Sequence, residues 1–107
     1  MMNPTLQEAG RRGPSTGGRF VRNWLPSPAT YYPAELKLSG RGAWRDALCC
    51  FHDDTRPSLR VNLSTGGFRC MACGAHGGDV LAFHQQRHGL TFPEAAKALG
   101  AWEGDND

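Results

Sequence analysis

Apolar and polar residues alternate along SLRVNL, residues 58–63, with an apolar side chain at every second position. This period of two is typical of a β-strand with one buried face, and it predicts that Arg60 and Asn62 share the exposed face. The sequence STGG then predicts a turn, and FRCMAC at residues 68–73 predicts a returning strand. A β-hairpin is therefore expected in the middle of the chain.

Two helices are predicted after this hairpin. The first, GDVLAFHQQRHG, has Asp79 as its N-cap and Gly89 as its stop. In the second, TFPEAAKALG, Thr91 and Glu94 form a capping box, and apolar residues at i, i+3, i+4 and i+7 make one stripe. We expect this stripe to pack on the sheet.

The segments outside this region lack such periodicity. Residues 1–22 are rich in Gly, Ser, Thr and Arg and predict a disordered basic arm. Prolines limit any helix in residues 23–44 to short pieces, so this segment is expected to be an N-terminal extension that packs against the core. Residues 45–101 then form the one folded domain, and residues 102–107 a frayed acidic tail.

The composition indicates one small domain. The chain has 107 residues, of which 14 are Gly and 7 are Pro, and a folded part of about 60 residues has a hydrophobic core that is marginal on its own. No apolar run approaches the about 18 residues of a membrane span, and the start lacks the apolar region of a signal peptide. We expect a cytoplasmic protein with neither a membrane nor a small-molecule substrate as its partner. In a reducing compartment, closely spaced cysteines indicate metal ligands rather than disulfides.

All four cysteines and one histidine fall within residues 49–73. Cys70 and Cys73 have the C-x2-C spacing of a metal-binding turn, and Cys49 and His52 repeat this spacing. Two such pairs complete a tetrahedral Zn²⁺ site with no open position, so one structural zinc ion is expected. The predicted fold is a small zinc-stabilised α+β domain: a zinc-ribbon antiparallel sheet with two C-terminal helices and a partly disordered N-terminal arm.

A rival ligand set follows a different pattern. Cys70, Cys73, His84 and His88 read C-x2-C-x10-H-x3-H, which is close to a C2H2 finger. This set leaves the first cysteines without a role, and its middle segment is short and Gly-rich where the helix needs apolar support. Cys50 belongs to neither set and is expected to be a buried apolar thiol.

Charge is distributed unevenly along the chain. The net charge is +2, but residues 1–60 hold nine Lys and Arg against five Asp and Glu, and ten of the twelve basic residues are arginine. Arginine suits bidentate contact with phosphate and stacking on bases, so the charge modestly favours a polyanionic partner. The sequence shows neither a nucleophile paired with a base nor a carboxylate cluster suited to two Mg²⁺ ions, and no catalytic site of its own is expected.

Three stretches, CCFHDDTRPSL, GGFRCMACGAHGGDVLAF and HGLTFPEAAKAL, carry a family resemblance over about residues 45–101. Their order resembles the Cys-His-Cys-Cys zinc-binding domain at the N-terminus of bacterial DnaG-type DNA primases. There are two departures: Cys50 stands where that family often has proline, and the Gly-rich loop is slightly longer. No stretch resembles the polymerase or helicase-binding domains of the family.

The resemblance implies the same four zinc ligands that the spacing favours. It also implies a domain that engages single-stranded template DNA through basic and aromatic side chains of the sheet. By position, the candidates for DNA contact are Arg56, Arg60, Phe68 and Arg69.

Three functions follow as hypotheses. The leading one is a zinc-dependent module that binds single-stranded DNA in replication and primer synthesis, with a separate primase polymerase or helicase as partner. The second is a zinc-ribbon adaptor that docks a replication or transcription protein. The third is one subunit of a split primase, which makes RNA primers only with a catalytic partner.

Overall fold

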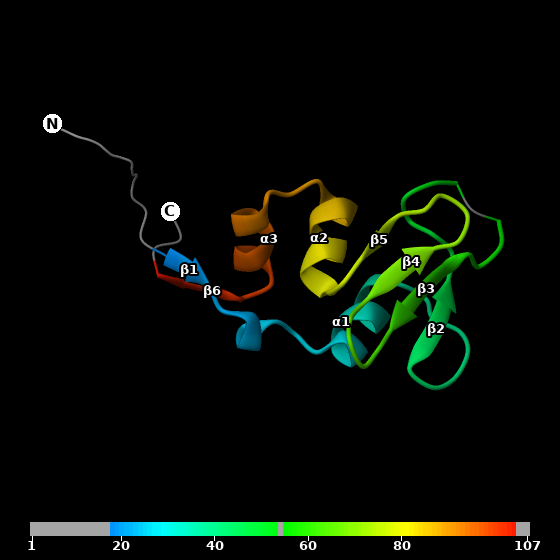
Figure 1. Ribbon diagram of the computed structural model, residues 1–107, viewed down its shortest axis with the longest axis horizontal. Coiled ribbons are helices and arrows are strands. Elements are labelled where there is room, and N and C mark those ends of the chain that lie inside the picture. The colour runs from blue at the N-terminus through cyan, green and yellow to red at the C-terminus, as the bar shows by residue number, and fades with distance from the viewer. Residues whose placement is uncertain (1–17, 54, 105–107) are drawn as a thin grey trace, which may run out of the picture.

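A computed structural model describes residues 18–53 and 55–104 of the chain (Figure 1). Its largest unit is a four-stranded sheet of order β2-β3-β4-β5, in which all neighbouring strands are antiparallel. The strands are β2 (Trp44–Ala47), β3 (Leu59–Asn62), β4 (Phe68–Cys70) and β5 (His76–Gly77). The predicted hairpin is the centre of this sheet, and the small α+β fold is confirmed.

Strands β3 and β4 separate a buried face of the sheet from an exposed one. Leu59 and Val61 have no exposed surface and Phe68 is 3% exposed, whereas Arg60 and Arg69 are exposed. Burying one such apolar side chain stabilises a fold by roughly 1.5–3 kcal/mol. A register slip of one residue would turn these side chains to water, so the burial fixes the register.

Asn62 departs from the predicted alternation. It is 8% exposed, although the pattern places it beside Arg60 on the exposed face. Its side-chain oxygen accepts hydrogen bonds from the amides of Ser64 at 2.8 Å and Thr65 at 2.9 Å. The side chain therefore caps the turn of the hairpin, and β3 ends at this residue.

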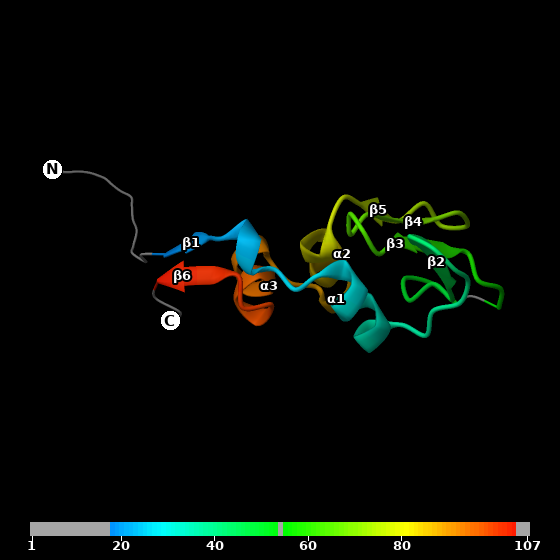
Figure 2. The ribbon, with the colours of Figure 1, turned by 90° about the horizontal axis from the view of Figure 1, so that it is seen from below.

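Two helices lie against the sheet and complete the main core: α1 (Pro28–Glu35) and α2 (Val80–His88) (Figure 2). Tyr32 and Phe83 have no exposed surface, and their rings meet edge to face with centroids 5.2 Å apart. Phe83 also meets Phe68 of the sheet at 5.2 Å. The aromatic cluster thus joins both helices to the buried face of the sheet.

The predicted helix boundaries are confirmed by their caps. Asp79 caps the start of α2, and Gly89 ends it in the left-handed conformation at φ 65°. In α3 (Phe92–Ala98), the hydroxyl of Thr91 accepts from the amide of Glu94 at 3.3 Å, and the carboxylate of Glu94 accepts from the amide of Thr91 at 2.9 Å. Within the described residues, no helix combines the length and the apolar character that crossing a membrane requires.

Helix α3 packs on α2 rather than on the sheet, which differs from the prediction for its apolar stripe. Ala95 and Ala96 have no exposed surface and form a second, smaller core with Leu81 of α2. The main core already fills the buried face of the sheet with side chains of α1 and α2. The stripe of α3 therefore finds its apolar partners on α2 and, through Phe92, on Phe20.

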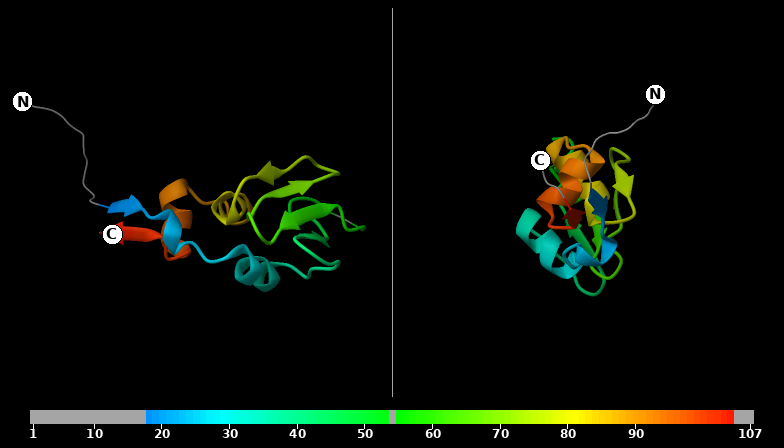
Figure 3. Two further views of the ribbon diagram at one scale, coloured as in Figure 1. Left: turned by 60° about the horizontal axis from the view of Figure 1, so that its bottom comes forward. Right: turned by 90° about the vertical axis from the view of Figure 1, so that its left-hand side faces the viewer.

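A two-stranded antiparallel ribbon lies at the end of the molecule away from the sheet (Figure 3). It pairs β1 (Gly18–Phe20) with β6 (Trp102–Gly104), so these residues belong to neither a disordered arm nor a frayed tail. Phe20 meets Phe92 edge to face at 5.0 Å and packs with Trp102 against the second core, which holds the ribbon in place. Residues 1–17 of the arm predicted for residues 1–22 lie outside the described residues.

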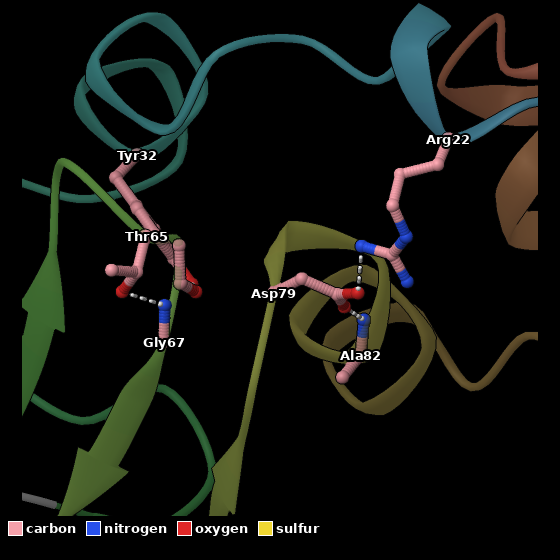
Figure 4. Close-up of polar contacts among 7 residues, drawn as sticks. Arg22, Tyr32, Thr65, Gly67, Asp79 and Ala82 are labelled. Atoms are coloured by element: carbon pink, nitrogen blue, oxygen red, sulfur yellow. Dashed lines mark hydrogen bonds and ion pairs between the residues drawn. The ribbon is translucent and has the colours of Figure 1, made fainter.

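One carboxylate connects the ribbon side of the chain to α2. The short 3-10 helix η2 (Arg22–Trp24) follows β1, and Arg22 donates to the carboxylate of Asp79 at 3.0 Å (Figure 4). The same carboxylate accepts from the amide of Ala82 at 2.8 Å as the N-cap of α2. Asp79 therefore serves both the helix and the connection between the two ends of the molecule.

Candidate metal centre

The four side chains predicted to bind zinc converge beside the sheet. They are Cys49, His52, Cys70 and Cys73, and their ligand atoms all lie within 4.8 Å of one another. The Sγ atoms of Cys49 and Cys73 are 3.8 Å apart, and Cys70 Sγ is 3.4 Å from His52 Nε2. Tetrahedral zinc gives separations of about 3.8 Å between two sulfurs and about 3.5 Å between sulfur and nitrogen. None of the four cysteines forms a disulfide, and the spacing of the ligand atoms fits a metal site.

The two pairs of ligands reach this site from different segments. Cys70 is the last residue of β4, and Cys73 lies in the turn that follows. The amide of Gly74 donates to the carbonyl of Cys70 at 3.0 Å and closes this turn at φ 82°, a conformation that favours glycine. Cys49 and His52 lie in the loop between β2 and β3, and the pairing of β3 with both neighbours brings this loop beside the turn.

Hydrogen-bond donors surround the sulfur of Cys70. It accepts from the amides of Ala72 at 3.4 Å and Cys73 at 3.3 Å, and the hydroxyl of Ser58 lies 3.5 Å away. Burial alone raises the pKa of Cys70, but the Ser58 hydroxyl and the two amides outweigh burial and lower this pKa to about 5. The thiolate, which is the form that binds metals, is therefore favoured at this position.

The pKa of Cys49 is shifted in the opposite direction from that of Cys70. Burial raises the pKa of Cys49 to about 12, and the nearby Cys70 adds to the rise, although the amide of Phe51 donates to the Cys49 sulfur at 3.4 Å. Two thiolates this close repel each other unless a cation lies between them. The donor set is thus chemically suited to a divalent cation that ionises both sulfurs.

His52 is oriented so that one ring nitrogen faces the sulfurs. Its Nδ1 lies 3.1 Å from the carbonyl oxygen of Asp53, while Nε2 faces Cys70. A proton on Nδ1 donates to this carbonyl and leaves the lone pair of Nε2 for a metal. Metal-binding histidines commonly use a backbone carbonyl in this way.

A family model described as the CHC2 zinc finger, of the DnaG zinc-ribbon type, matches residues 32–104. The chain belongs to the DnaG-type CHC2 zinc-finger family. Membership of this family and the cluster of three thiols and one imidazole together support a bound structural zinc ion. The match extends beyond the expected 45–101 at both ends and includes part of α1 and all of β6.

Curated relatives of this family member are DNA primases. The chain is 39% identical over 87 residues to the DNA primase of Streptomyces coelicolor, which covers 80% of this chain and 13% of the relative. It is 46% identical over 65 residues to the DNA primase of Mycolicibacterium smegmatis, which covers 61% of this chain and 10% of the relative. The chain therefore matches a small part of each of these proteins.

A solved structure shares the fold. The crystal structure of the Aquifex aeolicus primase, with its zinc-binding and RNA polymerase domains, matches with a TM-score of 0.63 at 29% identity. The match covers 70% of this chain and 18% of that chain. Fold, family and metal centre thus agree on the DnaG-type zinc-binding domain.

The rival ligand set does not assemble. His84 Nδ1 lies 2.7 Å from the hydroxyl of Tyr31, and His88 Nε2 lies 3.2 Å from Oε1 of Glu35. Both histidines form a separate group with Glu35, distinct from the cluster of Cys49, His52, Cys70 and Cys73. Cys50 joins neither group and packs, partly buried, against the main core.

The exposed face of the sheet carries charged and aromatic side chains on all four strands. Asp46, Arg60, Arg69 and His76 are successive cross-strand partners from β2 to β5. The Arg60 guanidinium lies 5.4 Å from the centroid of the Trp44 ring, and its Nε donates to Asp46 at 3.0 Å. We refer to these five residues as the outer row.

Two of the predicted DNA contacts, Arg60 and Arg69, lie in the outer row. Phe68 does not, because neighbouring residues of a strand face opposite sides, and its ring stacks on Phe51 in the core at 6.1 Å. Phe68 is therefore not available for contact with DNA. Arg56 is exposed in the loop between β2 and β3.

Trp44 and His76 of the outer row are not among the predicted contacts. Strand β2 has four residues and β5 has two, and neither shows an apolar alternation long enough to predict a strand. The signal that points to Trp44 is an aromatic residue next to Arg45 just before the hairpin. Only the pairing with β3 shows that Trp44 and Arg60 share one face.

Proposed function

We propose that this chain is a zinc-dependent module that binds single-stranded DNA with the outer row and serves DNA replication through primer synthesis. The observation that carries this proposal is the alignment of Arg60, Arg69 and His76 with an exposed tryptophan on one face of the sheet. Cys49, His52, Cys70 and Cys73 are the proposed ligands of the structural zinc.

The metal centre serves the outer row by holding the sheet together. Zinc with four protein ligands has no position for water or substrate, so it supplies structure rather than catalysis. The ligands tie the loop between β2 and β3 to the turn after β4. Folding free energy from such a site is on the order of 10 kcal/mol, which is more than a small core supplies alone.

The charges of the outer row favour a polyanion. Arg60 and Arg69 are direct cross-strand partners, and like charges in this position destabilise a sheet. Among residues 18–53 and 55–104, Asp46 is the ion-pair partner of Arg60, and an exposed pair of this kind contributes about 0–1 kcal/mol. A phosphate group can therefore replace Asp46 at small cost and relieve the repulsion between the arginines.

Trp44 supplies the second element that single-stranded DNA requires. Trp44 is 44% exposed, and its ring lies under the guanidinium of Arg60. Stacking of a base on an aromatic side chain contributes about 1–3 kcal/mol and tolerates any base sequence. The outer row therefore combines phosphate neutralisation with stacking, as a template-binding surface needs to do for many sequences.

Primer synthesis itself is assigned to a polymerase that these 107 residues do not include. Among the described residues the only groups of three or more potential metal ligands are the zinc cluster and the Glu35 group, neither of which is a carboxylate cluster for two Mg²⁺ ions. The relatives that carry the name DNA primase are much longer than this chain. We propose a primase polymerase or a helicase as the protein partner.

The test is fluorescence anisotropy of a labelled single-stranded oligonucleotide, titrated with zinc-loaded protein at two salt concentrations. Arg60→Gln and Arg69→Gln should each weaken binding and reduce the salt slope by about 0.7–1. Trp44→Ala should weaken binding with an unchanged slope. Arg19→Gln is the matched control, because Arg19 is exposed and ion-paired but lies in the ribbon. Equal behaviour of all four variants would remove the outer row from the proposal.

The adaptor hypothesis remains the alternative. Leu48 is 52% exposed beside a hollow lined by Lys37, Leu38 and Pro57, which favours a small apolar contact with a protein. An adaptor would form a specific protein complex and show little salt-sensitive affinity for DNA. Absence of DNA binding by the zinc-loaded protein at low salt would favour this function.

A further inference from the structure

A second group of metal-binding side chains lies where α1 meets α2. Glu35 is the last residue of α1, and His84 and His88 are one turn apart on α2. One ligand atom from each of the three lies within 4.8 Å of the other two. The imidazole rings of the two histidines are close, with centroids 4.5 Å apart.

We propose that Glu35, His84 and His88 form a second metal site, which takes a divalent transition metal such as Zn²⁺, Ni²⁺ or Co²⁺. Two imidazoles and one carboxylate are a donor set that these borderline cations prefer over Ca²⁺ or Mg²⁺. Three protein ligands leave at least one coordination position for water or an added ligand. This site thus differs from the closed cysteine centre in both its chemistry and its location.

The surroundings of the group orient its ligands. The hydroxyl of Tyr31 lies 2.7 Å from Nδ1 of His84, which leaves Nε2 of this ring for a metal. Tyr31 is itself 6% exposed, so the ring of His84 is held by a fixed partner. His88 and Glu35 already approach to 3.2 Å between Nε2 and Oε1, and a cation between these atoms replaces a contact that needs a proton.

Arg87 opposes the second cation and limits its affinity. Its Nε lies 3.4 Å from Oε1 of Glu35, and the partly buried thiol of Cys50 lies close to the same guanidinium. A bound metal competes with Arg87 for the carboxylate and is repelled by its charge. We therefore expect weaker binding than at the cysteine centre, and tighter binding when Arg87 loses its charge.

The site has a structural consequence. It joins the end of α1 to the last turn of α2, two helices that are otherwise held together mainly by their aromatic side chains. Occupancy would fix the position of α1 relative to the sheet without touching the cysteine centre.

The experiment is a titration of the full chain, loaded with one equivalent of zinc, with Ni²⁺ and with Co²⁺ at neutral pH. Calorimetry should give a second equivalent, and the absorption spectrum of this Co²⁺ should lack the charge-transfer bands of thiolate ligands. In NMR spectra, the imidazole resonances of His84 and His88 should shift when a second equivalent of Zn²⁺ is added. Loss of a residue that only hydrogen-bonds to a metal ligand lowers metal affinity about 10–100-fold. Glu35 and His88 are proposed as ligands themselves, so Glu35→Gln and His88→Ala should each lower the affinity for the second metal ion about 100-fold or more.

Matched variants separate this site from adventitious binding. Glu103→Gln removes another carboxylate that is paired with arginine, and Gln85→Ala changes a neighbouring side chain on α2; both should retain the second equivalent. Arg87→Gln should increase the affinity for the second metal ion about fivefold. The proposal is overturned if no second equivalent binds, if binding survives both Glu35→Gln and His88→Ala, or if thiolate bands accompany it. None of these outcomes bears on DNA binding by the outer row.

Discussion

The two ends of the molecule are stabilised in different ways. The sheet end has four strands, the aromatic core and a cluster of three thiols and one imidazole. The ribbon end has two three-residue strands and a second core in which two of the three buried side chains are alanines. The comparison teaches that the sheet end combines a cluster of metal-binding side chains with an aromatic core, while the ribbon depends on a few apolar contacts and the exposed Arg19–Glu103 ion pair.

The largest expected effect is removal of zinc. Removal of zinc by a chelator, or by the substitution Cys70→Ser, should unfold the four-stranded sheet. The folding free energy that zinc binding contributes is on the order of 10 kcal/mol. NMR checks this prediction: the amide resonances of β3 and β4 should lose their dispersion as the zinc content, measured in parallel, falls. Cys50→Ser is the control and should keep its zinc, since Cys50 lies outside the cluster. A folded sheet in the zinc-free protein would show that the aromatic core suffices.

Phe83→Ala should have the next largest effect, about 3–5 kcal/mol. Phe83 has no exposed surface and meets the rings of Tyr31, Tyr32, Phe51 and Phe68, so its loss leaves a cavity between the helices and the sheet. Urea unfolding of the zinc-loaded protein measures the loss. If Phe83→Ala lost less unfolding free energy than Leu81→Ala in the second core, the second core would contribute more to stability than the main core.

Gly18→Val tests the ribbon alone. Gly18 adopts φ 146°, and a Cβ at this position would collide with the indole of Trp102. Such overpacking typically costs about 1–3 kcal/mol, and here it should separate β1 from β6 while β3 and β4 remain protected from hydrogen exchange. Exchange of the amide of Val21, which bonds the carbonyl of Ala101 at 2.9 Å, reports the separation. Loss of protection throughout the sheet would show that the two ends fold as one unit.

The smallest effect concerns the link between the ends. Asp79→Ala removes the N-cap of α2 and the partner of Arg22, and should cost about 1 kcal/mol. Arg22→Ala removes the exposed ion pair and the contact of the guanidinium with the Phe20 ring, whose centroid lies 5.5 Å away, but leaves the cap in place, and it should cost about 0–1 kcal/mol. Thermal unfolding of both variants measures the difference. An equal cost would mean that the ion pair, not the cap, carries the contribution of Asp79.

The sheet end was largely predictable because its signals are local. Alternation marks β3, the Asp79 and Thr91 caps mark two helices, and the C-x2-H and C-x2-C spacings mark the metal cluster. Asn62 escaped the alternation because its side chain bonds the backbone of the turn. Phe68 was misplaced because family position alone does not say which side of a strand a residue faces.

The ribbon end was not predictable for the opposite reason. Arg19 and Glu103 pair across 84 residues of sequence, and neither β1 nor β6 has the length or alternation of a recognisable strand. Their pairing depends on apolar contacts with α3 that exist only after the helices have packed. Non-local contacts between short segments leave no periodic signal in a sequence.

The ribbon also determines how the protein would respond to mechanical force. Gly18 and Gly104 are direct partners in its register, so a pull applied at these two residues loads the strand pairs one after another and opens the ribbon like a zipper. The sheet would feel this tension only after the ribbon had opened. The ribbon would thus open first under load, while the four-stranded sheet keeps its pairing.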